Sequence, residues 1–386
     1  MKIGIDCRTI LNPAEGEAAG IGHYNYQLVR HLINSDKQNT YVLFFDHAVK
    51  EKRITKFKKE NVIIRYFPFS QYKKFLPTRY ANYLTAAAIE KENLDLFHSP
   101  VCELPMAYNG KSIVTIHDLA EFRAENCFEK AEAERLQKVI PESLAKAQGI
   151  IAVSNSTKDD VQYLFGIDDT KIKVIYNGID KRFFNRAELS EVEAVKNKFG
   201  IKGKYVLFLG TLETRKNILG IVGAFEALKN SNQEKYRDYQ LVLAGRHGHG
   251  IKNKLARIKK SAYVKDILVT NYIAADEIGP LYQGAEVFIF PSLYEGFGFP
   301  PLEAMAKNIP VLASNHPALV ETLGEAAILV DPKKQEVINQ GLIKILEDKN
   351  LQTELIAKGK IQARKFDWDE TTRETLEFYH KIINQK

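Results

Sequence analysis

Cysteine is scarce in this chain, which holds three among 386 residues: Cys7, Cys102 and Cys127. Because they are odd in number, far apart and outside any metal-binding spacing, neither a disulfide framework nor a zinc site is expected. Long apolar runs are also missing. No stretch approaches the roughly 18 apolar residues of a membrane span, and the first residues, Met1 to Asp6, lack the apolar core of a signal peptide. These absences predict a protein of the reducing cytoplasm.

Positive charge exceeds negative charge only modestly, with a formal net charge of +7, but part of it gathers between Lys50 and Lys74. Basic and aromatic residues alternate there: Lys50, Lys52, Arg53, Lys56, Lys58, Lys59, Arg65, Lys73 and Lys74 with Phe57, Tyr66, Phe67, Phe69, Tyr72 and Phe75. This basic-aromatic region is suited to an anionic membrane surface, which would make the protein peripheral on the inner face of the plasma membrane. A solvated face beside ordinary core aromatics explains it equally well. Nucleic acid is not an expected partner, because no nucleic-acid-binding motif accompanies the basic residues.

The length allows two domains, and 45% apolar with 27% charged residues is typical of soluble globular proteins. Short apolar runs alternate with helical segments along the whole chain. Strands are expected over 2–6, 41–45, 62–66, 94–98, 112–116, 149–154 and 171–176, then over 205–210, 240–245, 267–270, 287–290, 311–314 and 327–331. This alternation predicts an α/β protein with two parallel, doubly wound sheets that bind ligands at the carboxyl ends of their strands. The charged stretch 181–204 contains no strand and is expected to hold the domain boundary, close to residue 185.

The most informative segment runs from Glu286 to Lys307. Its strand is followed by a loop with Gly296 and Gly298, and Pro300-Pro301 suits the first turn of a helix. Backbone N–H groups and a helix dipole would then face a ligand such as a phosphate. Two carboxylates, Glu295 and Glu303, lie eight residues apart and can face one pocket. The alternative is that one complements the helix dipole and the other is solvated.

Other polar residues follow other predicted strands. Arg215 and Lys216 come after the strand 205–210, where two cations could neutralise a diphosphate. We expect both to be exposed in an empty cleft, because positive charge at a helix start is disfavoured until an anion arrives. His117 follows the strand 112–116, although a lone histidine is usually structural. Gly20-Ile-Gly22 precedes a helix expected over 23–33 and fails the spacing of a dinucleotide fingerprint.

Three further motifs favour structural interpretations. His247 and His249 stand beside no carboxylate or cysteine cluster, so a metal site there is disfavoured. Asp367-Trp-Asp369 precedes a helix and is better explained as a cap than as a metal-diphosphate motif. Ser156 is three residues before Asp159, which predicts that Ser156 caps the next helix. No metal and no cofactor is expected.

The segment Glu295-Gly-Phe-Gly-Phe-Pro-Pro-Leu-Glu303-Ala resembles the signature of the retaining glycosyltransferases of family 4, also called group 1. The adjacent Arg215-Lys216-Asn217 resembles the branch rich in bacterial mannosyltransferases. The resemblance covers essentially the whole chain. It implies the GT-B fold, with two Rossmann-like doubly wound domains facing across a cleft. An acceptor-side domain over 1–184, with a closing helix over 370–386, and a nucleotide-sugar-binding domain over 185–369 are expected.

The resemblance also implies roles for individual residues. A catalytic group would comprise His117, Glu295, Arg215 and Lys216, with the basic pair on the diphosphate and the other two on the transferred sugar. Donor-binding residues would be Glu303, Gly298, Phe297, Gly245, Tyr272, Gly22 and Gly20. Among these, Glu303 would hold the ribose hydroxyls and Tyr272 would lie in the loop that frames the base.

The implied reaction moves a hexose, with mannose favoured, from a nucleotide-diphosphate sugar, with GDP-mannose favoured, to an oligosaccharide or lipid-linked acceptor in bacterial cell-surface polysaccharide synthesis. Three alternatives stay open: a transferase using UDP-sugars, a nucleotide-sugar epimerase or phosphorylase on the same fold, and a binding scaffold without activity. The joint presence of His117, Arg215, Lys216, Glu295 and Glu303 argues against the scaffold, because loss of activity would be expected to erode them.

Overall fold

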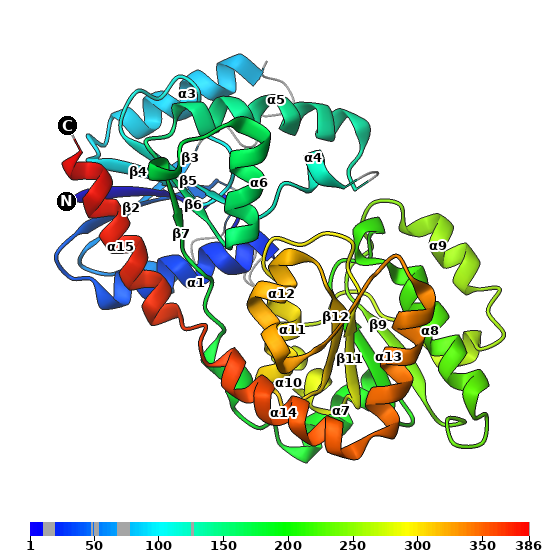
Figure 1. The fold of residues 1–386 in the computed structure, drawn as a ribbon. Helices are drawn as coiled ribbons and strands as arrows, with labels where there is room; N and C mark the ends of the chain where they lie inside the picture. Colours follow the sequence, from blue (N-terminus) through cyan, green and yellow to red (C-terminus); the bar gives the residue numbers. More distant parts are fainter. Residues whose placement is uncertain (11–19, 48, 50–53, 68–77, 125–126, 386) are drawn as a thin grey trace. The chain divides into compact units, whose positions relative to one another are not determined.

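The computed structural model describes residues 1–10, 20–47, 49, 54–67, 78–124 and 127–385. The protein consists of two compact units (Figure 1). Unit 1 comprises residues 1–119, 134–178 and 367–386, and unit 2 comprises residues 120–133 and 179–366. The boundary predicted after residue 184 therefore falls inside unit 2, and the chain passes back to unit 1 at Asp367 for its last helix.

In unit 1 the described residues form one sheet of seven parallel strands in the order β3-β2-β1-β4-β5-β6-β7. The strands are β1 (Lys2–Asp6), β2 (Thr40–Asp46), β3 (Val62–Phe67), β4 (Leu96–Ser99), β5 (Ser112–Ile116), β6 (Gly149–Ala152) and β7 (Ile172–Val174). Central strands such as β5 are buried on both faces, as their unbroken apolar runs require. The strand order reverses at β1, which pairs with β2 and β4, so this point is a topological switch where ligands bind in doubly wound folds.

The helices of unit 1 cover this sheet. They are α1 (Gly20–Ser35), η1 (Thr55–Phe57), α3 (Thr78–Glu90), α5 (Lys130–Lys146, which begins in unit 2), α6 (Asn155–Phe165), η3 (Asp169–Lys171) and α15 (Trp368–Asn384). The last helix packs closely on the sheet, since a Cβ at Gly149 would lie 2.8 Å from the ring of Phe378. Asp367 caps α15 by accepting from the Asp369 N–H, as predicted. The predicted cap of α6 was wrong: Ser154 rather than Ser156 accepts the Thr157 N–H, because the helix begins one residue before Ser156.

Unit 2 repeats the arrangement with a sheet of six parallel strands among the described residues, in the order β10-β9-β8-β11-β12-β13. The strands are β8 (Tyr205–Leu209), β9 (Gln240–Ala244), β10 (Ile267–Val269), β11 (Val287–Phe290), β12 (Val311–Ser314) and β13 (Ile328–Val330). The switch point here is β8, which pairs with β9 and β11. The loops after β8, β9, β10 and β11 therefore share one edge of the sheet.

The helices of unit 2 are α4 (Ala120–Arg123), η4 (Lys181–Phe184), α7 (Leu189–Phe199), η5 (Thr214–Lys216), α8 (Ile218–Ser231), α9 (Ile251–Ile258), η6 (Val264–Asp266), α10 (Ala275–Gln283), α11 (Phe299–Ala306), α12 (Pro317–Leu323), η7 (Gly324–Ala326), α13 (Gln335–Glu347) and α14 (Lys349–Ala363). The strandless stretch predicted over 181–204 is confirmed, since η4 and α7 occupy it. In the described part of the chain, no helix combines the length and apolar composition needed to cross a bilayer.

Candidate active site

The loop after β8 carries the basic pair and is fixed to the loop after β9 by main-chain hydrogen bonds. The Leu212 N–H donates to the Arg246 carbonyl at 2.8 Å, and the Gly248 N–H donates to the Leu212 carbonyl at 2.9 Å. Gly245 has a φ of +137°, and a Cβ there would lie 2.0 Å from the Gly210 carbonyl oxygen. Only glycine permits so close an approach of two backbones in this conformation. Gly245 therefore holds two functional loops together.

Arg215 and Lys216 form an ion cluster with two acids. The Lys216 Nζ lies 2.5 Å from one carboxylate oxygen of Glu295, and an Arg215 terminal nitrogen lies 3.3 Å from the other. The Arg215 Nε donates to Glu213 at 2.6 Å, and Arg215 also donates to the Tyr294 carbonyl at 3.2 Å. Two cations thus meet two carboxylates, so the cluster is formally neutral. Glu213 is not among the residues predicted from the sequence, although an acid two residues before Arg215 is a signal for this pairing.

The expected exposure of the basic pair was wrong for both residues: Lys216 is 7% exposed, and the Arg215 side chain is only 17% exposed. Burial would raise the pKa of Glu295, but Lys216 and Arg215 outweigh it and hold that pKa below its ordinary value. Burial and then Arg215 lower the pKa of Lys216. The Lys216 ammonium also lies 5.0 Å from the centre of the Phe290 ring on β11. The cations can be buried without a bound anion because Glu213 and Glu295 already neutralise them.

The glycine-bearing loop after β11 has the predicted geometry. Gly298 adopts a φ of +99° as the residue before α11, and Pro300 and Pro301 lie in the first turn of that helix. A Cβ at Gly298 would lie 2.4 Å from the Leu319 side chain, so glycine is required here for both conformation and space. At this helix start Gly298 and Phe299 carry backbone N–H groups, whereas Pro300 and Pro301 carry none. The positive end of the helix dipole lies here and is suited to an anion.

Phe297 lies in the core of unit 2. Its ring is 4% exposed and packs edge-on against Phe299 and Phe366, with centroids 5.2 and 5.5 Å away. Its carbonyl accepts from the Thr322 hydroxyl at 3.0 Å. These contacts anchor the loop that contains Gly298 to the core of unit 2.

Glu303 faces a different partner from Glu295. The Tyr282 hydroxyl of α10 donates to its carboxylate at 3.0 Å, and the side chain is largely buried. Burial raises the pKa of Glu303 to about 7, although Arg182 and the Tyr282 hydrogen bond oppose the shift. The two acids of the motif thus have opposite electrostatic settings, one held ionised by cations and the other close to half-protonated at neutral pH.

Two more of the predicted donor-binding residues, Gly245 and Tyr272, lie in the loops after β9 and β10. Tyr272 follows β10 and lies beneath the guanidinium of Arg246, whose carbon is 5.0 Å from the ring centre. Arg246, Gly245 and Tyr272 follow neighbouring parallel strands, and Gly245 also adjoins the loop that carries Arg215. Unit 2 therefore brings the predicted diphosphate and base residues to one sheet edge.

In unit 1, His117 directly follows β5 and is half-buried. Its Nε2 lies 2.9 Å from the Pro100 carbonyl and must carry the proton to donate, which leaves Nδ1 as an acceptor. Burial lowers its pKa, so the ring is neutral near pH 7. The ring also meets the edge of Tyr24, with centroids 4.6 Å apart. Gly20 and Gly22 lie in the first turn of α1, and Gly20 has a φ of +63°.

A buried hydrogen-bond chain supports this side of unit 1. The His98 ring bonds the Tyr379 hydroxyl through Nδ1 at 2.6 Å and the Thr115 hydroxyl through Nε2 at 2.8 Å. Thr115 in turn lies 3.3 Å from the Tyr24 hydroxyl, whose ring contacts His117. Burial lowers the pKa of His98 to about 3, so its ring stays neutral. The sequence did not predict this chain, because two of its bonded members, His98 and Tyr379, lie 281 positions apart.

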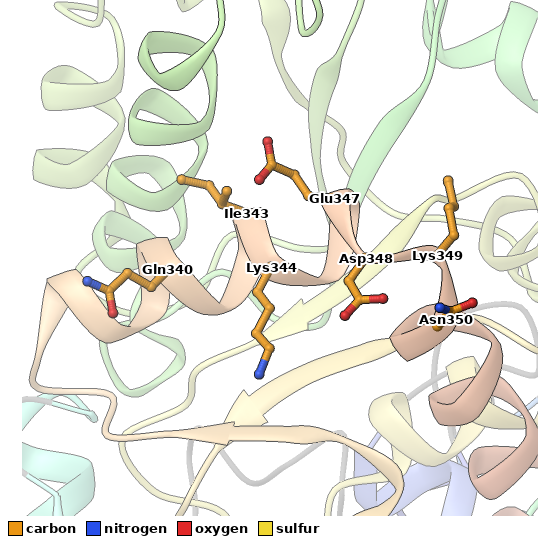
Figure 2. A pocket seen from close by; sticks show the side chains of 7 residues that line it. All are labelled: Gln340, Ile343, Lys344, Glu347, Asp348, Lys349 and Asn350. Atoms are coloured by element: carbon orange, nitrogen blue, oxygen red, sulfur yellow. The ribbon is translucent and has the colours of Figure 1, made fainter.

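A hollow of about 720 Å³ that contains none of the predicted site residues lies where α13 meets α14 (Figure 2). It is lined by Gln340, Ile343, Lys344, Glu347, Asp348, Lys349 and Asn350. Glu347 is bound there by Lys235 and Tyr236 at 3.4 and 3.3 Å, which indicates a structural role. Over the described ranges, no group of three or more His, Cys, Asp or Glu side chains could hold a metal ion.

Only part of the basic-aromatic region can be placed. Lys50, Lys52, Arg53, Phe69, Tyr72, Lys73, Lys74 and Phe75 lie outside the described residues. Of the remainder, Lys56, Lys58, Lys59, Arg65 and Tyr66 are exposed. Phe57 and Phe67 are core residues at 1% and 2% exposure. The core interpretation therefore holds for these two aromatics, while the described basic residues line the surface.

Comparisons with known proteins identify the family of the chain. The family described as Glycosyltransferase Family 4 matches residues 18–183, and the family described as Glycosyl transferases group 1 matches residues 191–362. O-antigen chain mannosyltransferase B of Escherichia coli is 26% identical over 380 residues, which is 95% of this chain and 97% of that protein.

Two solved structures share the fold over nearly the full length. Sucrose-phosphate synthase from Thermosynechococcus elongatus has a TM-score of 0.78 at 18% identity and covers 99% of this chain and 98% of its own. Anabaena HepE in complex with UDP-glucose has a TM-score of 0.74 at 16% identity and covers 99% of this chain and 100% of its own. At these identities the likeness concerns the fold.

Two doubly wound parallel units, one with basic and acidic side chains gathered at the carboxyl edge of its sheet, define the GT-B class of glycosyltransferases. Within this class, the chain belongs to the glycosyltransferases that contain a Glycosyltransferase Family 4 domain followed by a Glycosyl transferases group 1 domain, and it is a glycosyltransferase enzyme.

Proposed function

We propose that this enzyme transfers mannose, with retention of anomeric configuration, from GDP-mannose to a glycan or lipid-linked acceptor in bacterial cell-surface polysaccharide synthesis. The observation that carries the proposal is the buried cluster of Arg215 and Lys216 on Glu295, beside the loop that holds Gly298. The full-length similarity to an O-antigen chain mannosyltransferase supports the choice of mannose. The donor is assigned to unit 2 and the acceptor to unit 1.

Breaking a sugar–diphosphate bond leaves negative charge on the departing phosphate and positive charge on the sugar ring. Arg215, Lys216 and the N–H groups near Gly298 are assigned to the phosphate, where stabilising the developing charge contributes most to the rate. Glu295 accepts from both cations and is assigned to the donor sugar, since a carboxylate held ionised suits a ring that becomes positive. Glu303 is assigned to the ribose hydroxyls.

The chemical step follows from these assignments. The acceptor hydroxyl oxygen forms the new bond to the anomeric carbon on the face that the phosphate leaves. The phosphate oxygen keeps the electron pair of the broken bond and takes the proton of the attacking hydroxyl. His117, neutral with an acceptor at Nδ1, is assigned a contact to a sugar hydroxyl. Gly20 and Gly22 are assigned to the acceptor side, and no metal or other cofactor is required.

The test is transfer by the purified enzyme from radiolabelled GDP-mannose to membrane-extracted lipid-linked acceptors. Lys216→Ala and Arg215→Ala should each abolish transfer while circular dichroism shows the fold retained. Lys360→Ala, which removes an exposed lysine of α14, serves as the matched control and should leave transfer unchanged. Turnover near that of the wild type in either cluster variant would remove the diphosphate assignment.

A UDP-sugar donor is the second candidate, favoured by the UDP-glucose bound to HepE. Parallel assays with UDP-glucose and GDP-mannose separate the two. Incubation with the nucleotide-sugar alone tests the epimerase alternative, because an epimerase acts without an acceptor.

The exposed residues Lys56, Lys58, Lys59 and Arg65 support peripheral attachment to an anionic membrane. Flotation with vesicles of anionic or neutral lipid tests this proposal. Equal recovery with both kinds of vesicle would contradict it. A variant with Lys56, Lys58 and Lys59 replaced by Gln should float less with anionic vesicles.

A further inference from the structure

Arg246 and Tyr272 make a platform at the carboxyl edge of the unit 2 sheet. β9 and β10 are parallel neighbours, and these residues follow the two strands by two and three positions. The guanidinium carbon lies 5.0 Å from the centre of the Tyr272 ring. Tyr272 is half-buried, whereas Arg246 is exposed. An arginine stacked on an aromatic ring is held in one plane, so the N–H groups at its edge have a fixed direction.

The platform is joined to the basic pair through the backbone. Arg246 accepts the Leu212 N–H at 2.8 Å, and Leu212 stands three residues before Arg215 on the same loop. The contact of Gly245 with Gly210 leaves no room between the two loops. A diphosphate at Arg215 could therefore extend its nucleoside along an edge that Arg246 also lines, beside His247 and Lys254.

We propose that Arg246, oriented by Tyr272, reads the base of the donor nucleotide and selects guanine. The inference rests on the proposed function, because it requires a nucleoside diphosphate at Arg215. Guanine presents two adjacent acceptors, O6 and N7, which match two parallel guanidinium donors. Uracil has no second acceptor next to either of its carbonyl oxygens, and adenine places an amine donor beside N7. Of the three bases compared, only guanine therefore gains both bonds.

The test is calorimetric binding of GDP, UDP and ADP to the full-length enzyme and three variants. Wild type should bind GDP more tightly than UDP or ADP. Arg246→Ala should weaken GDP binding about tenfold or more, the value of one bidentate base contact. Arg246→Lys should lose a similar factor, because lysine keeps the charge without the planar fork. UDP affinity should change by less than about threefold in both, since an exposed charge acts weakly through solvent.

Arg257→Ala on α9 is the matched control, because it removes one exposed arginine of the same unit. It should leave the ratio of GDP to UDP affinity unchanged. An equal loss for GDP and UDP in Arg246→Ala would assign Arg246 to the phosphates and overturn the base contact. A wild-type preference for UDP, or an unchanged GDP affinity in Arg246→Ala, would also overturn the base contact while leaving the proposed donor site intact. Binding of none of the three nucleotides would instead refute the proposed function itself.

Discussion

Replacing Glu295 by glutamine tests the ion cluster most directly, because the amide has the same size and removes one charge. The side chain is 8% exposed and pairs with both Lys216 and Arg215. Breaking a buried ion pair costs about 3–5 kcal/mol. The glutamine oxygen can still accept from Lys216, and Arg215 keeps Glu213, so we expect the free energy of unfolding to fall by about 3 kcal/mol.

The same change should strengthen binding of GDP. The formal charge of the cluster rises from zero to +1, and at an effective dielectric constant near 20 two unit charges about 6 Å apart interact by about 3 kcal/mol. Solvent screening at the open edge reduces this to about 1–2 kcal/mol, which is about tenfold in affinity. Turnover should nevertheless fall, since Glu295 is assigned to the sugar rather than to the nucleotide.

Urea unfolding, GDP calorimetry and mannose transfer measure the three quantities on one preparation. Glu234→Gln, an exposed acid of unit 2, should change none of them. Weaker GDP binding together with unchanged stability in Glu295→Gln would refute the reasoning, because it would mean that the carboxylate binds the nucleotide and does not neutralise the cations.

Three further predictions concern stability. Burial raises the pKa of Glu303 to about 7, so the folded state binds this proton more tightly than the unfolded state does. The free energy of unfolding of the wild type should therefore fall by up to about 3 kcal/mol as pH rises from about 4.5 to 7. Urea midpoints for Glu303→Gln should lack this pH dependence. Tyr379→Phe leaves the buried Nδ1 of His98 without its hydrogen-bond partner and should lower the free energy of unfolding by about 1–3 kcal/mol in the same assay, and an unchanged midpoint would contradict the hydrogen bond. Gly245→Ala places a Cβ 2.0 Å from a carbonyl oxygen and should be more destabilising than Gly200→Ala, which has a positive φ but open space; equal thermal midpoints would count against the close approach.

Much of the fold could be predicted because its signals are local. The apolar run Val287–Phe290 is β11 without a shift at either end, and the glycine and proline residues after it begin α11 as expected. Predicted strand ends were wrong where the apolar run includes residues that do not pair with a neighbouring strand: β4 starts at Leu96 rather than at residue 94. Such runs are recognisable in sequence because both faces of a parallel strand are buried.

The electrostatics of the site could not be predicted in the same way. The sequence places Glu295 about eighty positions from Lys216, and only the parallel pairing of β8 with β11 brings them together. Lys216 was expected to be exposed in a cleft without a bound anion, and the sequence did not show that Glu295 neutralises it. The setting of Glu303 likewise depends on Tyr282, which belongs to the preceding helix α10. Charge partners across a sheet edge depend on strand order, which no local pattern encodes.

Unit 1 is discontinuous in sequence. Its sheet is formed before unit 2 in the chain, whereas α15, with Tyr379 bonded to His98 in the core, follows unit 2. A fragment that stops before Asp367 would therefore contain every strand of unit 1 but leave Phe378 absent from Gly149 and His98 without Tyr379. Unit 1 cannot be isolated by a single cut, and a fragment meant to fold alone would need α15 joined back to residue 178 by a linker.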